Sequence, residues 1–234
     1  MKNKFLSLIL AFCLIVPCMY VFVACGKDKN VDTNIYVTED NTLESAINQV
    51  DDGGKIVLNT DVTLDTAMVI TKQFTLNLND RTISLPNDTV GDGVFHVTEG
   101  GKLTIEGDGV INGVGQNDYN MAIWADGGEV VINGGTFTNS ALIGTDDHYD
   151  LIYAGNGGIV TINGGVFDCK TPKWTLNLKD NSNSQMIVKG GTFKNYNPSN
   201  SQTENPVANF VAEGYEAIQL TISGETWYKV NPAQ

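Results

Sequence analysis

The chain has 234 residues and a formal net charge of −13. Such acidity argues against nucleic acid as a partner and against electrostatic attraction to anionic lipids. It also disfavours a polyanionic glycan, unless a bound cation bridges the two. The length suits one repeat domain preceded by a targeting segment.

The N-terminus has the features of an export signal. Lys2 and Lys4 precede an apolar run over residues 5–24, the order of charged and apolar regions in a secretory signal. We therefore predict a signal peptide over residues 1–24. An uncleaved N-terminal membrane helix is the alternative, because the apolar run is nearly long enough to span a bilayer.

A cysteine follows this run directly. Ala24 precedes Cys25, and Phe22 stands three residues before it. The stretch resembles the lipobox of bacterial lipoproteins, with Phe22 where that pattern prefers an aliphatic residue. The resemblance implies that Cys25 is lipidated, that residues 25–40 form a lipid anchor and polar tether, and that the protein is exported to the outer face of the membrane or the cell surface. Contact with the membrane is then through the lipid alone.

The cysteines do not provide a disulfide framework. Cys13 and Cys18 lie in the predicted signal peptide and Cys25 is the predicted anchor, which leaves Cys169. Cys169 follows an apolar strand and is predicted to be buried. Packing and backbone pairing must therefore hold the exported domain together.

A strand near residues 34–37 is followed by a predicted helix in the region 41–54. Asn41 is placed to cap the helix, with Glu44 three residues later as in a capping box. The apolar residues of the segment form one stripe at helical spacing: Leu43, Ala46, Ile47 and Val50. We predict that this helix covers the open N-terminal end of the repeats that follow.

One sequence frame recurs through the middle of the chain. Gly127–Phe137 reads as a glycine pair, an alternating strand, a second glycine pair and a Phe, and Gly157–Phe167 repeats it. Looser copies place the second glycine step of successive units 27, 30 and 26 residues apart, at Gly107, Gly134, Gly164 and Gly190. A period in this range is typical of stacked units, none of which can bury its apolar face alone.

Aligned at these spacings, the copies give three apolar columns. Polar residues alternate with them, which indicates strands with one buried face and one solvated face. The glycine steps would break the helices of a helical solenoid. Asn133 and Asn163 fall at one corner of consecutive units, where we expect their amides to form a ladder. The columns are Leu76, Leu103, Val130, Val160 and Met186; Leu78, Ile105, Ile132, Ile162 and Val188; and Ile83, Val110, Phe137, Phe167 and Phe193.

Three short strands per unit, glycine corners and columns of like residues resemble the right-handed parallel β-helix of the pectate-lyase-like superfamily. The resemblance implies an all-β fold, with five or six three-strand coils over residues 55–210. Residues 211–234 are similar to the closing segments of bacterial surface β-helix proteins, and we predict that they form capping strands.

The connections after the third column vary most, and variable loops on one side of a solenoid are common binding sites. Aromatic residues with carboxylates and amides are the combination that binds sugars. Turn-forming and coil-sealing roles are the alternative for the same residues. The predicted ligand-binding residues in these loops are Asp92, Asp118, Tyr119, Asn120, Tyr149 and Trp174.

The densest cluster of acids is Asp146, Asp147, His148 and Asp150. These residues are candidate catalytic groups, because two carboxylates about 5–10 Å apart can act on a glycosidic bond. The three aspartates are also candidate ligands for a divalent cation such as calcium, although no cofactor is required. Adjacent acids in a loop are otherwise simply solvated.

Comparison with the catalytic residues of pectate-lyase-like enzymes weakens the case for catalysis. Pectate lyases of this fold use calcium-binding aspartates with an Arg or Lys base, and the single arginine here, Arg81, stands at a predicted coil corner. Polygalacturonase-like relatives use aspartates from neighbouring coils, whereas Asp146, Asp147 and His148 are contiguous.

Two further candidates are predicted to have packing roles. At the repeat spacings, His96 aligns with Ile123 and Tyr153, and Trp124 aligns with Ala154. These alignments favour a structural histidine and a packing tryptophan.

These observations favour a lipid-anchored, non-catalytic surface protein that binds a polysaccharide or another cell-envelope component through its loop-bearing face. The alternatives are a polysaccharide lyase or glycoside hydrolase acting on a neutral or cation-bridged glycan, and a purely structural module.

Overall fold

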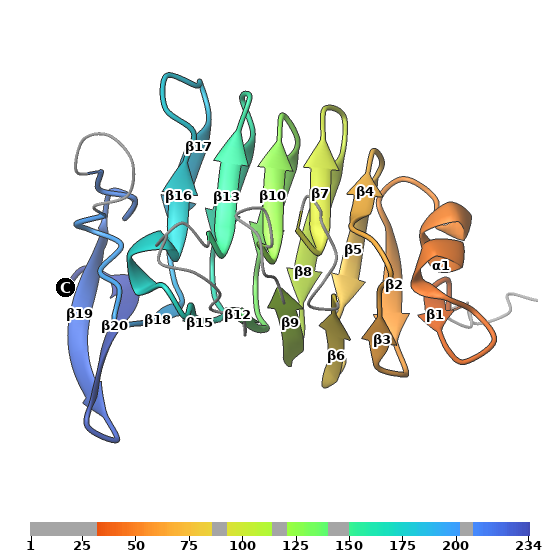
Figure 1. Cartoon of the computed structure of the whole chain (residues 1–234), viewed down its shortest axis with the longest axis horizontal. Helices are drawn as coiled ribbons and strands as arrows, with labels where there is room; N and C mark the ends of the chain where they lie inside the picture. The colour runs from red at the N-terminus through yellow and green to blue at the C-terminus, as the bar shows by residue number, and fades with distance from the viewer. Residues whose placement is uncertain (1–31, 86–92, 114–120, 140–149, 202–207) are drawn as a thin grey trace, which may run out of the picture. The chain divides into compact units, whose positions relative to one another are not determined.

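The computed structural model describes residues 32–85, 93–113, 121–139, 150–201 and 208–234. Thr33–Gln234 forms one compact unit. Of the described residues, 53% are in strands and 6% in helices, so the protein is all-β. The strands form a parallel β-solenoid with three sheets, as Figure 1 shows.

The seven-stranded sheet is parallel throughout. Its order is β1 (Ile35–Val37), β2 (Gly54–Leu58), β5 (Gln73–Asn77), β8 (Lys102–Glu106), β11 (Glu129–Ile132), β14 (Ile159–Ile162) and β17 (Gln185–Val188).

The eight-stranded sheet has six parallel strands and a C-terminal hairpin. Its order is β3 (Val62–Thr63), β6 (Arg81–Ser84), β9 (Gly109–Gly113), β12 (Thr136–Asn139), β15 (Val166–Asp168), β18 (Thr192–Lys194), β20 (Glu225–Pro232) and β19 (Tyr215–Ile222).

The five-stranded sheet completes the coil. Its order is β4 (Met68–Ile70), β7 (Phe95–Thr98), β10 (Ile123–Asp126), β13 (Ile152–Gly155) and β16 (Leu176–Leu178).

The chain visits the three sheets in the same order in each round. Among the described residues, β2–β3–β4 is the first complete round, β14–β15–β16 is the fifth, and β17–β18 begin a sixth. The first round contains the two-residue β3, and about four turns of the solenoid are regular. Each strand pairs with its counterpart one coil along the stack, so the inner side chains form continuous files.

The predicted stacking of like residues is confirmed at the centre of the core. Ile132 pairs with both Ile105 and Ile162 in parallel register, and all three side chains are fully buried. The rings of Phe137 and Phe167 stack with centroids 5.1 Å apart, and Phe193 continues that stack at 4.7 Å. Burying each such side chain stabilises the fold by about 1.5–3 kcal/mol.

The first predicted column is wrong at its start. Leu103 pairs with Phe74, and Leu76 pairs with Ile105 in the second file. In the structure the paired residues of β5 and β8 are 29 positions apart in the sequence. The prediction used a spacing of 27 and therefore aligned Leu76 with Leu103. Leu78 is buried just beyond the end of β5.

The third predicted column is wrong at Val110, which lies on the outer side of β9. Ile111 pairs with both Ile83 and Phe137 and is fully buried. The corner before β9 contains one additional residue compared with the later coils. Gly107 and Gly109 form it with φ angles of 77° and 145°, which glycine adopts most readily.

The recurring glycines also allow the coils to approach closely. A Cβ atom at Gly158 would lie 2.1 Å from the carbonyl oxygen of Ala125, and one at Gly190 would lie 2.1 Å from that of Asn163. The predicted amide ladder forms at the same corner, where Asn163 Nδ2 donates to Asn133 Oδ1 at 2.9 Å.

The N-terminal helix is shorter than predicted and has a different cap. Helix α1 covers Leu43–Gln49, and the hydroxyl of Thr42, not Asn41, accepts the Ser45 backbone N–H at 3.2 Å. Asn41 instead donates through Nδ2 to the Tyr36 carbonyl at 2.8 Å, which holds it against β1.

The C-terminal residues close the other end of the stack. Strands β19 and β20 form an antiparallel hairpin, and β20 pairs antiparallel with β18, with Tyr228 opposite Phe193. Strand β20 runs opposite to the other strands of the sheet and so ends the parallel repeat. Its residue Val230 is buried.

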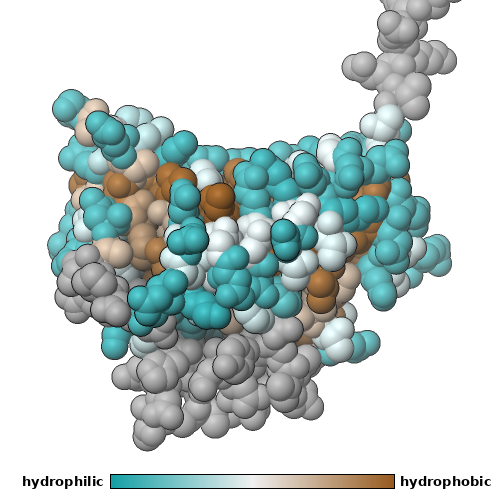
Figure 2. All heavy atoms as spheres, turned by 90° about the horizontal axis from the view of Figure 1, so that it is seen from above, coloured by the Kyte–Doolittle hydropathy of each residue, from teal (hydrophilic) through white to brown (hydrophobic). Residues whose placement is uncertain are grey.

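The described surface is mainly polar on the side drawn in Figure 2, where hydrophobic residues lie in small groups among hydrophilic ones. No helix among the described residues is long and apolar enough to cross a membrane. The predicted signal peptide, residues 1–24, lies outside the described residues.

Neighbouring residues of β11 test the core. We expect Ile132→Ala to lower the free energy of unfolding by about 2–5 kcal/mol, because it leaves a cavity between two paired isoleucines. Val131→Ala, on the partly exposed face of the same strand, should cost about 1 kcal/mol or less. Urea denaturation of both variants measures the difference. Equal losses of unfolding free energy would contradict the stacking of inner side chains from coil to coil.

Candidate functional site

Most of the predicted site residues lie outside the described residues. These are Cys25, Asp92, Asp118, Tyr119, Asn120, Asp146, Asp147, His148 and Tyr149. Asp150 and Trp174 are described. Among the described residues, no group of three or more His, Cys, Asp or Glu side chains is arranged to hold a metal ion.

Trp174, one of the predicted ligand-binding residues, is buried. It lies in a 3-10 turn, η1 (Pro172–Trp174), and only 4% of its surface is exposed. Thr171 and Thr175 close the turn: the Trp174 N–H donates to the Thr171 carbonyl, and the Thr175 hydroxyl donates to the Pro172 carbonyl. Lys173 Nζ lies 4.9 Å from the indole centroid. Asp150, just before β13, is partly buried.

The structure brings together a different set of residues on the outer face of the five-stranded sheet. One residue from each strand contributes to a single file along this face, which we call the outer file. It consists of Val69, His96, Trp124, Tyr153 and Asn177.

The alignment at the repeat spacings did not predict the outer file. It matched His96 with Ile123 and Trp124 with Ala154, but His96 pairs with Trp124, and Trp124 pairs with Tyr153. The connections that enter the five-stranded sheet differ in length, so the spacing measured at the glycine corners does not carry across. A sequence signal did exist: in β7, β10 and β13 an apolar residue, an aromatic ring and a small apolar residue follow one another.

Two rings of the outer file stack face to face. The His96 and Trp124 centroids are 4.2 Å apart with an interplanar angle of 3°. Tyr153 is tilted by 50° against Trp124, with centroids 6.3 Å apart. The stack of parallel rings therefore ends at Trp124, and Tyr153 breaks the parallel arrangement.

A chain of polar contacts runs beside the rings. His96 Nε2 lies 3.0 Å from Asp126 Oδ2, and Asn156 Nδ2 donates to Asp126 Oδ1. Lys179 Nζ then donates to Asn156 Oδ1 at 3.0 Å. These contacts link β7, β10 and the corners of the next two coils, and they orient the imidazole on which the Trp124 indole stacks.

Two polar groups of the outer file lack partners among the described residues. The Trp124 Nε1 atom is buried without a hydrogen-bond acceptor. Asn177 is 1% exposed, and neither its amide nitrogen nor its amide oxygen has a partner. Each buried, unsatisfied polar group costs about 1–3 kcal/mol. Ordered water or a ligand would satisfy these groups. Trp227 Nε1, on the C-terminal hairpin, is buried without a partner in the same way.

The two unpaired groups lie on either side of Tyr153. Trp124 is on β10 and Asn177 on β16, two strand steps apart, which corresponds to about 10 Å. Of these groups only the Tyr153 ring is partly exposed. The Trp124 indole N–H and the Asn177 carboxamide, which can donate and accept, are buried on either side of it.

Cys169 is buried, as predicted, and is not placed for nucleophilic chemistry. Burial raises the pKa of its thiol, while contacts with Thr171 and Asn139 lower it by a smaller amount. Burial likewise raises the pKa of Tyr196, whose hydroxyl donates to Ser201 Oγ at 2.8 Å. Both groups keep their protons in the folded protein.

Comparisons with known proteins do not identify the chain. No family model, no curated protein and no solved structure matches it. The fold and the outer file are therefore the basis for assigning a function.

The raised pKa values predict a loss of stability at high pH. The unfolded chain releases the Cys169 and Tyr196 protons at their ordinary pKa values of about 8.5 and 10, whereas the folded protein retains them. The free energy of unfolding should therefore fall as the pH rises above about 8.5. Urea titrations of the wild type and Cys169→Ala between pH 8 and 10 test this, and the decline should be shallower in the variant. Parallel declines would contradict the assignment to Cys169.

Proposed function

We propose that this protein is a lipid-anchored, exported β-helix of the pectate-lyase-like type that binds a glycan of the cell envelope without catalysis. The N-terminal lipobox-like sequence at Cys25 supports the anchor, and the mainly polar face drawn in Figure 2 is compatible with a solvent-exposed domain. The glycan proposal depends on the outer file.

The main support for the proposal is that Trp124 Nε1 and the Asn177 amide, on either side of Tyr153, have no hydrogen-bond partner among the described residues. Both groups are buried in this structure, so binding requires the groups that cover them to move aside. A sugar hydroxyl can then accept from Trp124 Nε1–H, and another can pair with the Asn177 amide. The apolar face of a sugar ring packs well against a tilted phenol ring between these groups. Their separation of about 10 Å suits a ligand of more than one sugar unit.

A neutral glycan fits this face best. The charged groups beside it, Asp126 and Lys179, already have polar partners: Asp126 contacts His96 and Asn156, and Lys179 donates to Asn156. The net charge of −13 repels a polyanionic glycan at long range.

Two conservative variants test the binding face. Trp124→Phe keeps an aromatic ring against His96 but removes the indole donor, and Asn177→Leu removes the amide at similar volume. Each should weaken retention of a neutral envelope glycan about tenfold on a glycan array, the effect of losing about 1.4 kcal/mol. Trp227→Phe, on the C-terminal hairpin, is the matched control and should retain full binding.

Three results would contradict the proposal. They are loss of binding in the Trp227→Phe control to the same degree, unchanged binding in both outer-file variants, and release of cleaved glycan products by the wild type. The third would instead support a hydrolase or lyase.

The anchor is tested separately at Cys25. Cells expressing the wild type and supplied with a labelled fatty acid should incorporate the label into this protein, and Cys25→Ser should abolish incorporation and release the protein from the membrane fraction. Cys169→Ser is the control and should remain labelled. Equal labelling of Cys25→Ser and the wild type would overturn the lipoprotein assignment.

A further inference from the structure

The N-terminal end of the solenoid is covered unevenly. Strand β1 extends the seven-stranded sheet by one strand beyond β2, and α1 packs against β1. The eight-stranded sheet begins at β3, and no strand among the described residues pairs with the outer edge of β3. Its backbone groups on that edge are available to another strand.

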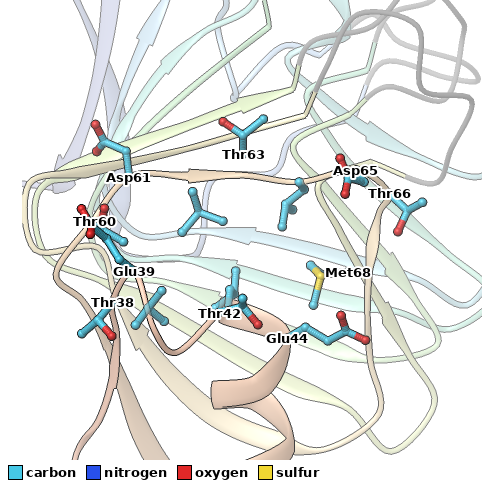
Figure 3. Close-up of a pocket in the computed structure, with 14 residues that line it drawn as sticks. Thr38, Glu39, Thr42, Glu44, Thr60, Asp61, Thr63, Asp65, Thr66 and Met68 are labelled. Carbon is cyan, nitrogen blue, oxygen red and sulfur yellow. The ribbon is translucent and has the colours of Figure 1, made fainter.

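A cavity of about 490 Å³ lies along this edge, between β3 and the β1–α1 segment. Its apolar lining residues are Val37, Leu43, Val62, Leu64 and Met68. Figure 3 shows Met68 among the lining side chains, with labelled polar residues at both ends of the cavity. We call this cavity the N-terminal groove.

Carboxylates stand at both ends of the N-terminal groove. Figure 3 shows Glu39 and Asp61 at one end, and Glu44 and Asp65 at the other. None of the 14 lining residues is Lys, Arg or His. Lys72, the basic residue beside α1, instead donates to the Val50 carbonyl at 2.6 Å and the Ile47 carbonyl at 3.1 Å.

We propose that the N-terminal groove binds an extended segment of a partner protein as an added strand on β3, with basic side chains at both ends of the segment. An unpaired strand edge supplies main-chain hydrogen bonds, and the side chains beside it supply selectivity. The apolar lining residues accept aliphatic side chains, and the two pairs of carboxylates select Lys or Arg at the flanks. This site is separate from the outer file and does not depend on the glycan proposal.

The spacing of the acids defines the probe. Asp61 and Asp65 flank β3 and are four residues apart in the sequence, so they are at most about 13 Å apart along the chain. Lysines at the ends of a five-residue extended peptide have the same separation. The probe is acetyl-Lys-Val-Thr-Val-Lys-amide. Its two valines lie on the face opposite the lysines, as Val62 and Leu64 lie opposite Asp61 and Asp65. The control peptide carries glutamate in place of both lysines.

The test measures peptide binding to the full chain by calorimetry. The lysine peptide should bind and slow backbone amide exchange in β3, and the glutamate peptide should not bind. The double variant Asp61→Asn/Asp65→Asn should weaken binding at least tenfold. The Asp61→Asn substitution keeps a side-chain oxygen that accepts the Thr82 backbone N–H, as Asp61 Oδ1 does at 2.8 Å, so the fold is preserved. Glu99→Gln/Glu213→Gln removes two charges elsewhere and should bind like the wild type.

The proposal is overturned if both peptides bind equally, or if the groove variant and the control variant lose affinity alike. It is also overturned if exchange slows outside β3 and not within it, or if calcium chloride alone displaces the lysine peptide at stoichiometric concentration. The last result would assign the groove to a cation.

Discussion

Parallel pairing between successive coils is the interaction on which the rest of the structure depends. No coil has an interior of its own: Ile132 is buried only because Ile105 and Ile162 lie directly on either side of it. The Phe137, Phe167 and Phe193 rings repeat the arrangement on a second wall. Because every inner side chain needs a partner of similar size one coil away, the inner positions are tightly constrained, and the outer positions are not.

This constraint determines where binding residues can lie. On the five-stranded sheet, the inner residues of β7, β10 and β13 complete the core, so the alternate residues can carry His96, Trp124 and Tyr153 without disturbing it. The solenoid then holds these side chains one strand step apart, on a backbone that is fixed by pairing on both sides. The same constraint makes the ends exceptional, because an end coil has one partner fewer. The C-terminal end is closed by an antiparallel hairpin, whereas the N-terminal end keeps an unpaired strand edge, within the described residues, beside an acidic groove.

The sequence predicted the repeat, the all-β solenoid and most of the core, because glycine corners and period-two alternation are local signals. It misplaced Val110 and Leu76, since one additional residue at a corner, or a longer step between coils, shifts the register without changing the apolar pattern. It chose Asn41 as the helix cap because Asn and Thr both cap well, and a tertiary contact with the Tyr36 carbonyl decides between them. The outer file escaped prediction because its register depends on the lengths of the connections between sheets, and the missing partners of Trp124 and Asn177 exist only in three dimensions.

Methyl contacts in solution test the central claim most directly. In a sample labelled only at isoleucine δ1 methyl groups, nuclear Overhauser spectra should show cross-peaks from Ile132 to Ile105 and to Ile162, its neighbours on the adjoining strands. Ile105 and Ile162 lie two strand steps apart, about 10 Å, and should show a much weaker direct peak or none. Strong peaks from Ile132 to both neighbours would establish the stacked coils. Absence of both peaks in the folded protein would contradict the parallel files, and with them the outer file and the N-terminal groove.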